Sequence, residues 1–471
     1  MTDFHEHGDP VTLKHRSEFG EAYDLLKFVS KDEARKAEAL REEILGESVR
    51  DIVLRNKRTK PVYRGISQGC EYCGTGSWSC LFINGRCNCR CFYCPTEQRI
   101  IGLPTTNTLT FPRTQEYVSY INQLDFRGVS ISGGEPLLTL EVTVKYISAI
   151  RRNFGDRVYL WIYTNGTLVD YDILSRLRDA GLDEIRFDIG ATEYSLKKVS
   201  MAVGLIKHVT VEIPAVPDDY GRVKDALHTM SENGVSFLNL HQLRLTPHNR
   251  PNLTSRDYTY LHGEHITVLE SELTALKLMR HASENRIPLS INYCSFVYKN
   301  RFQRAAARRR CAPLIMSPYE DITENGYIRS LYVKGPADVL GSLAESLKMS
   351  GCRSDKWHVK NDKERIFFSA AVWHHISFDA VRLGVAYFDS RLVPALSYRN
   401  LFREIHLTRN RSIFVERSRV TEDMEISGEQ RNILENLIIK GEEGGAQTFA
   451  EAPLDQILQY ETVVPDLQKY A

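Results

Sequence analysis

The chain has 471 residues, of which 42% are hydrophobic and 26% are charged, and its 61 basic residues nearly balance its 60 acidic ones. This length suits two or three globular domains. The near-zero net charge predicts no general affinity for nucleic acid or membranes, and the chain lacks the apolar stretch of about 18 residues that would predict a membrane span. Residues 1–10 lack the features of a secretory leader, so we expect a cytoplasmic protein with reduced thiols.

A regular alternation of strand-like and helix-like segments begins at residue 78. Short β-branched and aromatic runs predict strands, and the longer amphipathic stretches between them predict helices. The predicted strands are 78–85, 128–134, 157–166, 184–191, 208–216 and 237–246, with a further one at 289–295. Repeated β-then-α units imply parallel strands joined by helical crossovers. About six units predict a partial (βα)6 TIM-like barrel, with its reactive residues at the carboxyl ends of the strands.

The regions on either side of the barrel have other patterns. Residues 18–55 are rich in Glu, Lys, Ala and Leu, which predicts one or two helices. After residue 355 the pattern predicts strands joined by short loops and a final helix that begins after Ser427 and stops at Gly441. The fold class is therefore α/β, with a helical N-terminal lead-in and a C-terminal α+β domain. The expected division is 1–77 (helical lead-in with a cysteine-bearing loop), 78–300 (barrel), 301–354 (basic helix and connecting segment) and 355–471 (accessory or substrate domain).

Four of the ten cysteines lie in the sequence GRCNCRCFYCPTEQ, residues 85–98. Cys87, Cys91 and Cys94 have the spacing C-x3-C-x2-C and follow the first predicted strand. In a reducing compartment, clustered thiols are more often metal ligands than disulfides. Thiolates suit zinc or iron–sulfur clusters. A structural zinc site would need four ligands, whereas three cysteines would leave one iron of a [4Fe–4S] cluster open to another ligand.

This cysteine motif, with the aromatic Tyr93 before its last cysteine, resembles the radical S-adenosylmethionine (SAM) superfamily. Three further motifs are similar to motifs of that family, each at the end of a predicted strand: SGGEPLL (132–138), YTNG (163–166) and FDIGA (187–191). The resemblance covers roughly residues 78–300. Within the superfamily, GCEYCGTGSWSCLFINGRC (69–87) resembles proteins loosely related to pyruvate formate-lyase activating enzyme, most of which have no assigned reaction.

The resemblance implies particular roles for the motif residues. Cys87, Cys91 and Cys94 would bind the [4Fe–4S] cluster, and SAM would bind its open iron. The residues expected to contact SAM are Gly133, Gly134 and Glu135 at the methionine amino group, Tyr93 at the adenine, and Asn165 and Asp188 at the methionine or ribose. Two glycines would let the backbone approach the ligand closely, and Glu135 would accept a charge-assisted hydrogen bond from its ammonium group.

The implied reaction is radical chemistry. The reduced cluster would cleave SAM to a 5′-deoxyadenosyl radical, which would abstract hydrogen from a small-molecule or peptide substrate; the electron would come from a donor such as flavodoxin or ferredoxin. One alternative is the activation of a glycyl-radical enzyme. An alternative of another class is a non-catalytic protein that binds zinc and RNA, although its balanced charge makes nucleic acid an unexpected partner. No membrane partner is expected.

Other polar residues are less specific. Cys70, Cys73 and Cys80 could hold a second iron–sulfur cluster, with Cys89, Cys294, Cys311 or Cys352 as fourth ligand; a zinc site or free buried thiols are the alternatives. Residues 300–311 hold five arginines, which could contact an anionic substrate or RNA, or form a solvated or interdomain helix face. His241 and Arg244, near the end of the sixth strand, could reach the substrate.

Overall fold

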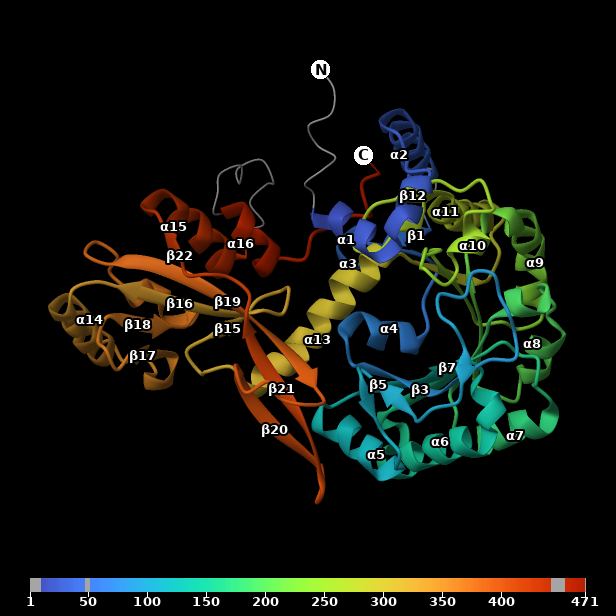
Figure 1. Ribbon diagram of the computed structural model, residues 1–471, viewed down its shortest axis with the longest axis horizontal. Helices are drawn as coiled ribbons and strands as arrows, with labels where there is room; N and C mark the ends of the chain where they lie inside the picture. The colour runs from blue at the N-terminus through green and yellow to red at the C-terminus, as the bar shows by residue number, and fades with distance from the viewer. Residues whose placement is uncertain (1–9, 47–50, 442–453, 471) are drawn as a thin grey trace. The chain divides into compact units, whose positions relative to one another are not determined.

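The computed structural model describes residues 10–46, 51–441 and 454–470 (Figure 1). The chain divides into two compact units: Met1–Asn300 together with Pro465–Ala471, and Arg301–Val464. Residues 1–9, on which the expectation about a leader mainly rests, lie outside the described residues. Of the helices in the described ranges, none is both long enough and apolar enough to cross a membrane. The four-part division expected from the sequence remains a prediction.

Seven parallel strands form the core of the first unit within the described residues. Their order is β3–β7–β8–β9–β10–β11–β14. They span Trp78–Arg86 (β3), Gly128–Gly133 (β7), Tyr159–Thr164 (β8), Glu184–Phe187 (β9), His208–Pro214 (β10), Phe237–His241 (β11) and Ser290–Cys294 (β14). The first six are the predicted (βα)6 strands, and the seventh is the predicted further strand. The partial TIM-like barrel is therefore confirmed.

The sheet is open at both edges. Two antiparallel strands extend it beyond β14, namely β2 (Lys60–Tyr63) and β1 (Ile52–Leu54). Beyond β3 lie β5 (Thr105–Thr106) and β6 (Leu109–Thr110). The remaining short elements of this unit are β4 (Arg99–Ile100), β12 (Tyr260–Leu261), β13 (Thr267–Val268), α3 (Arg55–Arg58), α10 (Arg250–Leu253) and α12 (Phe296–Tyr298).

The crossover helices lie on the outside of the parallel strands (Figure 1). They are α5 (Thr114–Gln123), α6 (Leu140–Phe154), α7 (Tyr171–Asp179), α8 (Lys197–Ala202), α9 (Tyr220–Glu232) and α11 (Leu269–Glu284). Each buries one face; α6, for example, buries Tyr146, Ile147 and Ile150 at helical spacing. The strands are covered on both faces, which explains why a strand such as β9 is buried along its whole length.

Helix α4 (Gln68–Thr75) packs on the strands from the side of their amino ends. Ser67 caps the helix by accepting a hydrogen bond from the Cys70 amide, and Gly76 ends it in a left-handed conformation. The packing is close: a Cβ on Gly128, the first residue of β7, would lie 3.0 Å from Tyr72. The expected cysteine-bearing loop is thus a helix in part, and it carries Cys70 and Cys73 into the barrel.

Tyr470, near the C-terminus, packs against α2 (Lys31–Leu45) and α11 in this first unit. Helix α1 (Pro10–Phe19) and a 3-10 turn (Gly20–Leu25) precede α2, which begins with a capping box of Ser30 and Glu33. The helical prediction for residues 18–55 is therefore confirmed for α2, whereas Ile52–Leu54 forms β1 and residues 47–50 lie outside the described ranges. Tyr470 hydrogen-bonds Glu272 of α11, and its ring lies 4.3 Å from the Arg41 guanidinium.

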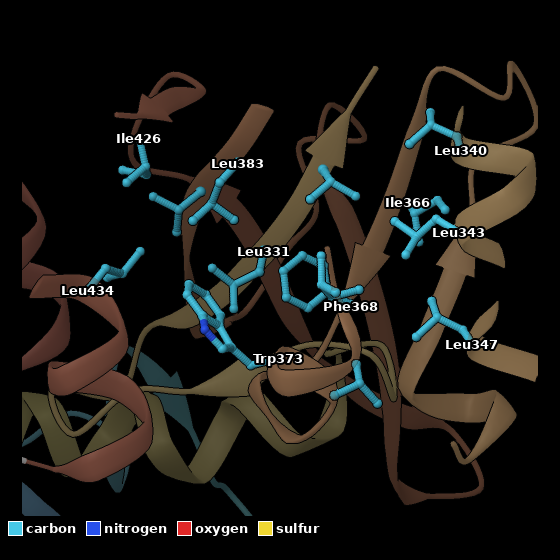
Figure 2. Packing of buried hydrophobic residues seen from close by; sticks show 14 of the residues in the cluster. Leu331, Leu340, Leu343, Leu347, Ile366, Phe368, Trp373, Leu383, Ile426 and Leu434 are labelled. Carbon is cyan, nitrogen blue, oxygen red and sulfur yellow. The ribbon is translucent and has the colours of Figure 1, made fainter. Parts of the chain in front are cut away.

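The second unit is an antiparallel sheet covered by helices, which is an α+β arrangement. Its strand order is β17–β18–β16–β19–β21–β20. The strands are β15 (Asp321–Ile322), β16 (Ile328–Lys334), β17 (Trp357–Val359), β18 (Arg365–Phe368), β19 (Arg382–Val393), β20 (Leu401–Thr408), β21 (Arg411–Arg419) and β22 (Met424–Ile426); the helices are α13 (Arg304–Cys311), α14 (Ala337–Met349), α15 (Gly428–Glu435) and α16 (Leu454–Glu461). Figure 2 shows the core, in which Leu343 and Leu347 of α14 face the strand residues Ile366 and Phe368. Helix α15 has the predicted Ser427 cap.

Candidate active site

A cavity of about 560 Å³ opens at the carboxyl ends of the parallel strands, where a barrel of this type holds its reactive residues. The predicted site residues that line it are Cys87, Cys91, Cys94, Tyr93, Gly133, Gly134, Asn165 and Asp188. The structure therefore brings together residues that are up to about 100 positions apart in the sequence. Four predicted residues do not line it: Glu135, which is fully buried, and Cys70, Cys73 and Cys80 of the possible second cluster.

The cysteine loop is tied to strands on both sides. On one side, the Asn165 amide group donates to Asn88 Oδ1 at 2.8 Å and lies 3.6 Å from Cys87 Sγ. On the other side, Asn249 Nδ2 donates to the Tyr93 carbonyl at 3.1 Å, and Thr246 Oγ1 donates to the Pro95 carbonyl at 2.9 Å. The loop is thus held by residues that follow β8 and β11, and its thiols are fixed on the cavity wall.

The donor set of this loop fits an iron–sulfur cluster. Burial raises the pKa of Cys91 to about 12, so this thiol is protonated at neutral pH until a metal binds. Within the described residues, no three Cys, His, Asp or Glu side chains are grouped to hold one metal ion. A [4Fe–4S] cluster makes a different demand, because each thiolate binds a different iron. Three thiols on one cavity wall meet that demand.

Gly133 and Gly134 are required by packing against the start of the cysteine loop. Gly133 has a φ of +139°, and a Cβ placed on it would lie 2.1 Å from the Asn84 carbonyl oxygen. A Cβ on Gly134 would lie 2.1 Å from the Arg86 carbonyl oxygen. The sequence argument assigned these glycines to close approach by a ligand. The structure adds that the backbone of β3 and of the cysteine loop already excludes a side chain at both positions.

The Glu135 carboxylate is occupied by donors from the protein. It accepts hydrogen bonds from the Asn165 amide at 2.7 Å, from Thr164 Oγ1 at 2.9 Å and from the Leu137 amide at 3.0 Å. Burial raises the pKa of Glu135, and these hydrogen bonds oppose that rise. Glu135 therefore ties the end of β7 to the end of β8, and its expected role as an acceptor for the SAM ammonium remains a prediction.

Tyr93 and Asp188 form a pair at the cavity. The Tyr93 hydroxyl donates to the Asp188 carboxylate, with distances of 2.9 and 3.1 Å to its two oxygens. Asp188 also accepts from the Gly190 amide at 3.1 Å, so it caps the turn after β9. Burial raises the pKa of Asp188 to about 6, although the Tyr93 hydrogen bond lowers it. The pair fixes the Tyr93 ring relative to β9.

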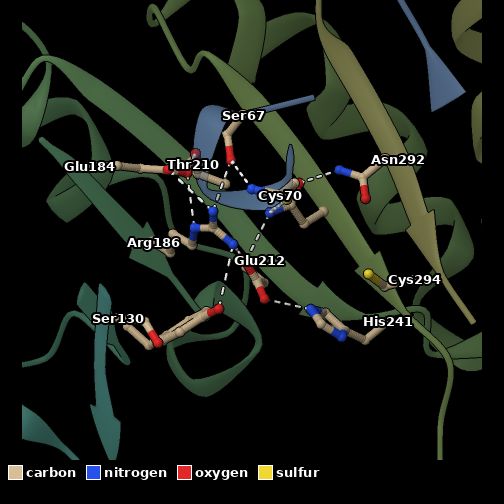
Figure 3. A network of polar contacts seen from close by, with 12 residues as sticks. Ser67, Cys70, Ser130, Glu184, Arg186, Thr210, Glu212, His241, Asn292 and Cys294 are labelled. Carbon is tan, nitrogen blue, oxygen red and sulfur yellow. Dashed lines mark hydrogen bonds and ion pairs between the residues drawn. The ribbon is translucent and has the colours of Figure 1, made fainter. Parts of the chain in front are cut away.

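A network of charged residues forms the floor of the cavity (Figure 3). Arg186 Nη1 donates to Glu212 Oε2 at 2.8 Å, and its Nη2 donates to Ser67 at 2.8 Å and Glu184 at 3.2 Å. Glu212 Oε1 lies 2.5 Å from His241 Nε2. Burial alone would raise the pKa of Glu212, but Arg186 and His241 lower it below its ordinary value. Arg186 is thus neutralised by two buried carboxylates.

His241 continues the network to Lys299. The Lys299 Nζ lies 2.8 Å from His241 Nδ1. Because an ammonium can only donate, Nδ1 accepts this hydrogen bond, and Nε2 therefore carries the proton that is donated to Glu212. Burial lowers the pKa of His241, and the neighbouring Lys299 lowers it further, which agrees with a neutral imidazole. The chain Glu212–His241–Lys299 leads from the barrel floor to the cavity.

Sequence reasoning singled out His241 and Arg244, which both line the cavity, but it missed Arg186, Glu212 and Lys299. One signal could have found Arg186 and Glu212. Each is a charged residue inside a predicted strand of the barrel, in EIRF and HVTVEIP, and buried charges occur mostly with partners. Lys299 has no such signal, because its position depends on where the chain leaves β14.

The other cysteines lie in different surroundings. Cys70 lies near Asn239, whose Nδ2 is 3.6 Å from its sulfur, and Lys60 Nζ lies 3.2 Å from Cys294 Sγ. Burial alone would lower the pKa of Lys60, but Cys294, Cys70 and Cys73 raise it. The hydrogen-bond partners of Cys80 are Ser130 and Ser132. Cys70, Cys73 and Cys294 therefore share a buried ammonium group.

The arginines of residues 301–310 make contacts inside the second unit. Arg308 donates to the backbone and side chain of Asn325 at 2.8 and 2.6 Å and lies 4.2 Å from the Tyr327 ring. Arg301 donates to the Val464 carbonyl at 2.9 Å. These contacts favour the structural interpretation of the arginines over an anion-binding face.

Comparison with known proteins identifies the family of the chain. The Radical SAM superfamily profile matches residues 81–249. A protein of Methanocaldococcus jannaschii, which its name assigns provisionally to the glycyl-radical enzyme activating enzymes, is 30% identical over 297 residues, covering 60% of this chain and 78% of that protein. A GTP 3′,8-cyclase of Corynebacterium glutamicum is 28% identical over 172 residues, covering 35% of this chain and 43% of that enzyme.

Two solved structures give weaker matches. Streptococcus suis SuiB bound to the precursor peptide SuiA aligns with a TM-score of 0.36 at 12% identity, covering 52% of this chain and 57% of that one. Native anSMEcpe with bound AdoMet aligns with a TM-score of 0.28 at 16% identity, covering 35% and 50%. The chain spans about half the length of each. Both TM-scores are low, and neither likeness adds to the family assignment.

The chain belongs to the radical SAM superfamily. It is an enzyme, so the alternative of a non-catalytic zinc- and RNA-binding protein is wrong. Membership implies a [4Fe–4S] cluster and SAM as cofactors. Which residues hold them remains a prediction.

Proposed function

We propose that Cys87, Cys91 and Cys94 hold the [4Fe–4S] cluster and that SAM binds beside it in the same cavity. When bound, the cluster and SAM supply a 5′-deoxyadenosyl radical that abstracts a hydrogen atom from the substrate. The observation that carries this proposal is the shared cavity, which gathers the three thiols, both glycines and residues of six parallel strands in one place. Among the described residues, no cysteine outside the loop 87–94 lines this cavity.

The remaining motif residues position the ligand in this proposal. The Gly133–Gly134 backbone lines the cavity on the side expected to take the SAM methionine. Glu135 accepts a hydrogen bond from the Asn165 amide after β8, and the Asn165 side chain in turn supports the cysteine loop. Tyr93 and Asp188 line the side of the cavity that is expected to bind the adenine and ribose.

The substrate is a small molecule or a peptide side chain. A cavity of about 560 Å³ is in the range that encloses small ligands, and its floor carries charged groups that a small polar substrate would contact. The alternative is activation of a glycyl-radical enzyme, which the name of the M. jannaschii relative favours. In either case the electron would come from a donor such as flavodoxin or ferredoxin.

A second cluster on Cys70, Cys73 and Cys80 has less support. A shared site would need these thiols around one metal centre, but Lys60 lies among Cys70, Cys73 and Cys294, and Cys80 bonds to serines. Burial raises the pKa of Cys70, and the neighbouring Arg186 and Lys60 offset only part of that rise. If an auxiliary cluster forms, Cys294 rather than Cys80 is the better partner for Cys70 and Cys73.

The test combines two measurements on anaerobically reconstituted protein: iron and sulfide per chain, and 5′-deoxyadenosine formed from SAM with dithionite. Wild type should hold about four irons and form 5′-deoxyadenosine. The Cys87→Ala/Cys91→Ala/Cys94→Ala variant should form none, while the matched Cys89→Ala variant, in the same loop but outside the spacing, should retain the activity. A triple variant that still cleaves SAM would refute the assignment. A triple variant that keeps about four irons without activity would instead reveal a second cluster.

A further inference from the structure

Two cationic side chains face the cavity from the wall beyond the predicted SAM contacts. Lys299 follows β14, and Arg244 follows β11; both line the cavity. They share one aromatic neighbour, because Lys299 Nζ lies 4.7 Å and the Arg244 guanidinium carbon lies 5.8 Å from the centre of the Phe296 ring. The two positive charges are therefore brought to the same part of the cavity by one ring.

Neither cation has a carboxylate partner among the described residues. The polar contact of Lys299 is the neutral His241, and Arg244 Nε is buried without a hydrogen-bond partner. Neighbouring groups act on them without a direct ion pair: Cys294 and then Glu212 raise the pKa of Lys299, and Glu18 of α1 raises that of Arg244. Burial lowers the pKa of both side chains, as expected for cations that lack a counter-charge.

Two other cations of the protein have the carboxylate partners that Lys299 and Arg244 lack. Arg186, on the floor of the same cavity, has Glu184 and Glu212. In the second unit, Arg329 has Glu461 and Asp321. Arg244 and Lys299 are both half-buried and line the cavity. A ligand in the cavity can therefore supply the opposite charge that the protein does not place beside them.

We propose that Lys299 and Arg244 bind an oxyanion, a carboxylate or phosphate group, of the substrate. This inference rests on the proposed function, since it assigns a substrate class to the same cavity. Arg244 offers a planar fork of donors and Lys299 a compact charge. The Lys299 ammonium donates one of its three protons to His241, which leaves two for the ligand. Glu212 fixes His241 in the tautomer whose Nδ1 accepts that hydrogen bond. Glu212 and His241 are thus positioning residues for Lys299.

The test is calorimetric titration of the reconstituted holoenzyme with two probes, inorganic phosphate and acetate, each with and without bound SAM. At least one probe should bind saturably, and it should bind also when SAM is present. Lys299→Met and Arg244→Met should each weaken that binding by about tenfold or more. Lys299→Arg and Arg244→Lys, which keep the charge, should lose less. The probe that binds distinguishes a phosphorylated substrate from a carboxylate substrate.

Matched controls are Arg222→Met and Lys224→Met on α9, since neither residue lines the cavity; they should bind the probe like wild type. Thermal unfolding of each variant shows whether it is folded. If neither probe binds, if the Met variants bind like wild type, or if SAM displaces the probe, the proposal is overturned; displacement would mean that the anion is the SAM carboxylate. Formation of 5′-deoxyadenosine by the same wild-type preparation tests the proposed function separately.

Discussion

The floor of the cavity and the wall beyond the predicted SAM contacts hold charge in different ways. On the floor, Arg186 has two buried carboxylate partners, Glu184 and Glu212. On the wall, Lys299 and Arg244 line the same cavity, and neither has a carboxylate partner among the described residues. The paired charges of the floor stabilise the fold, whereas the charges of the wall are the ones that we propose bind a ligand.

The largest expected effect comes from removing the ion pairs of Arg186 with Glu184 and Glu212. Arg186→Met should lower the free energy of unfolding by about 3–5 kcal/mol, because it leaves the buried carboxylates of Glu184 and Glu212 without their cation. Chemical denaturation of the reconstituted protein measures this. The control is Arg178→Met, whose partner Asp179 is also exposed and whose loss should cost about 1 kcal/mol or less. Equal effects of the two substitutions would contradict the comparison.

Removal of Glu135, which follows β7, should have an intermediate effect. Glu135→Ala leaves the Asn165 amide, the Leu137 amide and the Thr164 hydroxyl without their acceptor, which should cost about 1–3 kcal/mol. Iron content after reconstitution should also fall, since Asn165 supports the cysteine loop. Glu135→Gln keeps one acceptor oxygen and should retain more of both. If Glu135→Ala is as stable as wild type, then its hydrogen bonds do not organise the site.

The pH dependence of stability should reveal the Glu212 carboxylate. Its pKa in the folded protein is lowered from the ordinary 4.5, so the stability that it contributes is complete above that pH and is lost as the pH falls below it. Glu212→Gln binds no proton there, so its free energy of unfolding should fall less steeply below pH 4.5. Acid loss of the cluster affects both proteins alike. Parallel curves for the two proteins would show that Glu212 is not ionised in this network.

The smallest effect is expected from loss of the Tyr93–Asp188 hydrogen bond. Tyr93→Phe removes one hydrogen bond to Asp188, which should lower the free energy of unfolding by about 0.5–1.5 kcal/mol. Iron content should be unchanged, because the hydroxyl lies outside the three thiols. Phe92→Leu, at the neighbouring ring, is the matched control for packing. A loss of iron in Tyr93→Phe would mean that the Tyr93–Asp188 pair helps to form the cluster loop.

The sequence predicts this architecture well where the information is local. Strand periodicity located all the parallel strands, and spacing located Cys87, Cys91 and Cys94 on one cavity wall. It could not show that Gly133 and Gly134 pack against backbone, or that Glu135 is occupied by protein donors, since both facts depend on neighbouring strands. Lys299 was missed for the same reason: nothing near it in the sequence indicates that the sixth and seventh strands place it beside His241.

The return of Tyr470 to Glu272 and Arg41 makes the first unit discontinuous, so that the second unit is an insertion with two covalent attachments. A fragment that stops at residue 300 is therefore not the barrel unit. It would lack the Arg58–Asp466 ion pair and the hydrogen bond from the Tyr470 amide to Glu38, and Glu272 would lose the Tyr470 hydroxyl. To express the barrel alone, residues 465–470 would have to be rejoined to residue 300 by a designed linker.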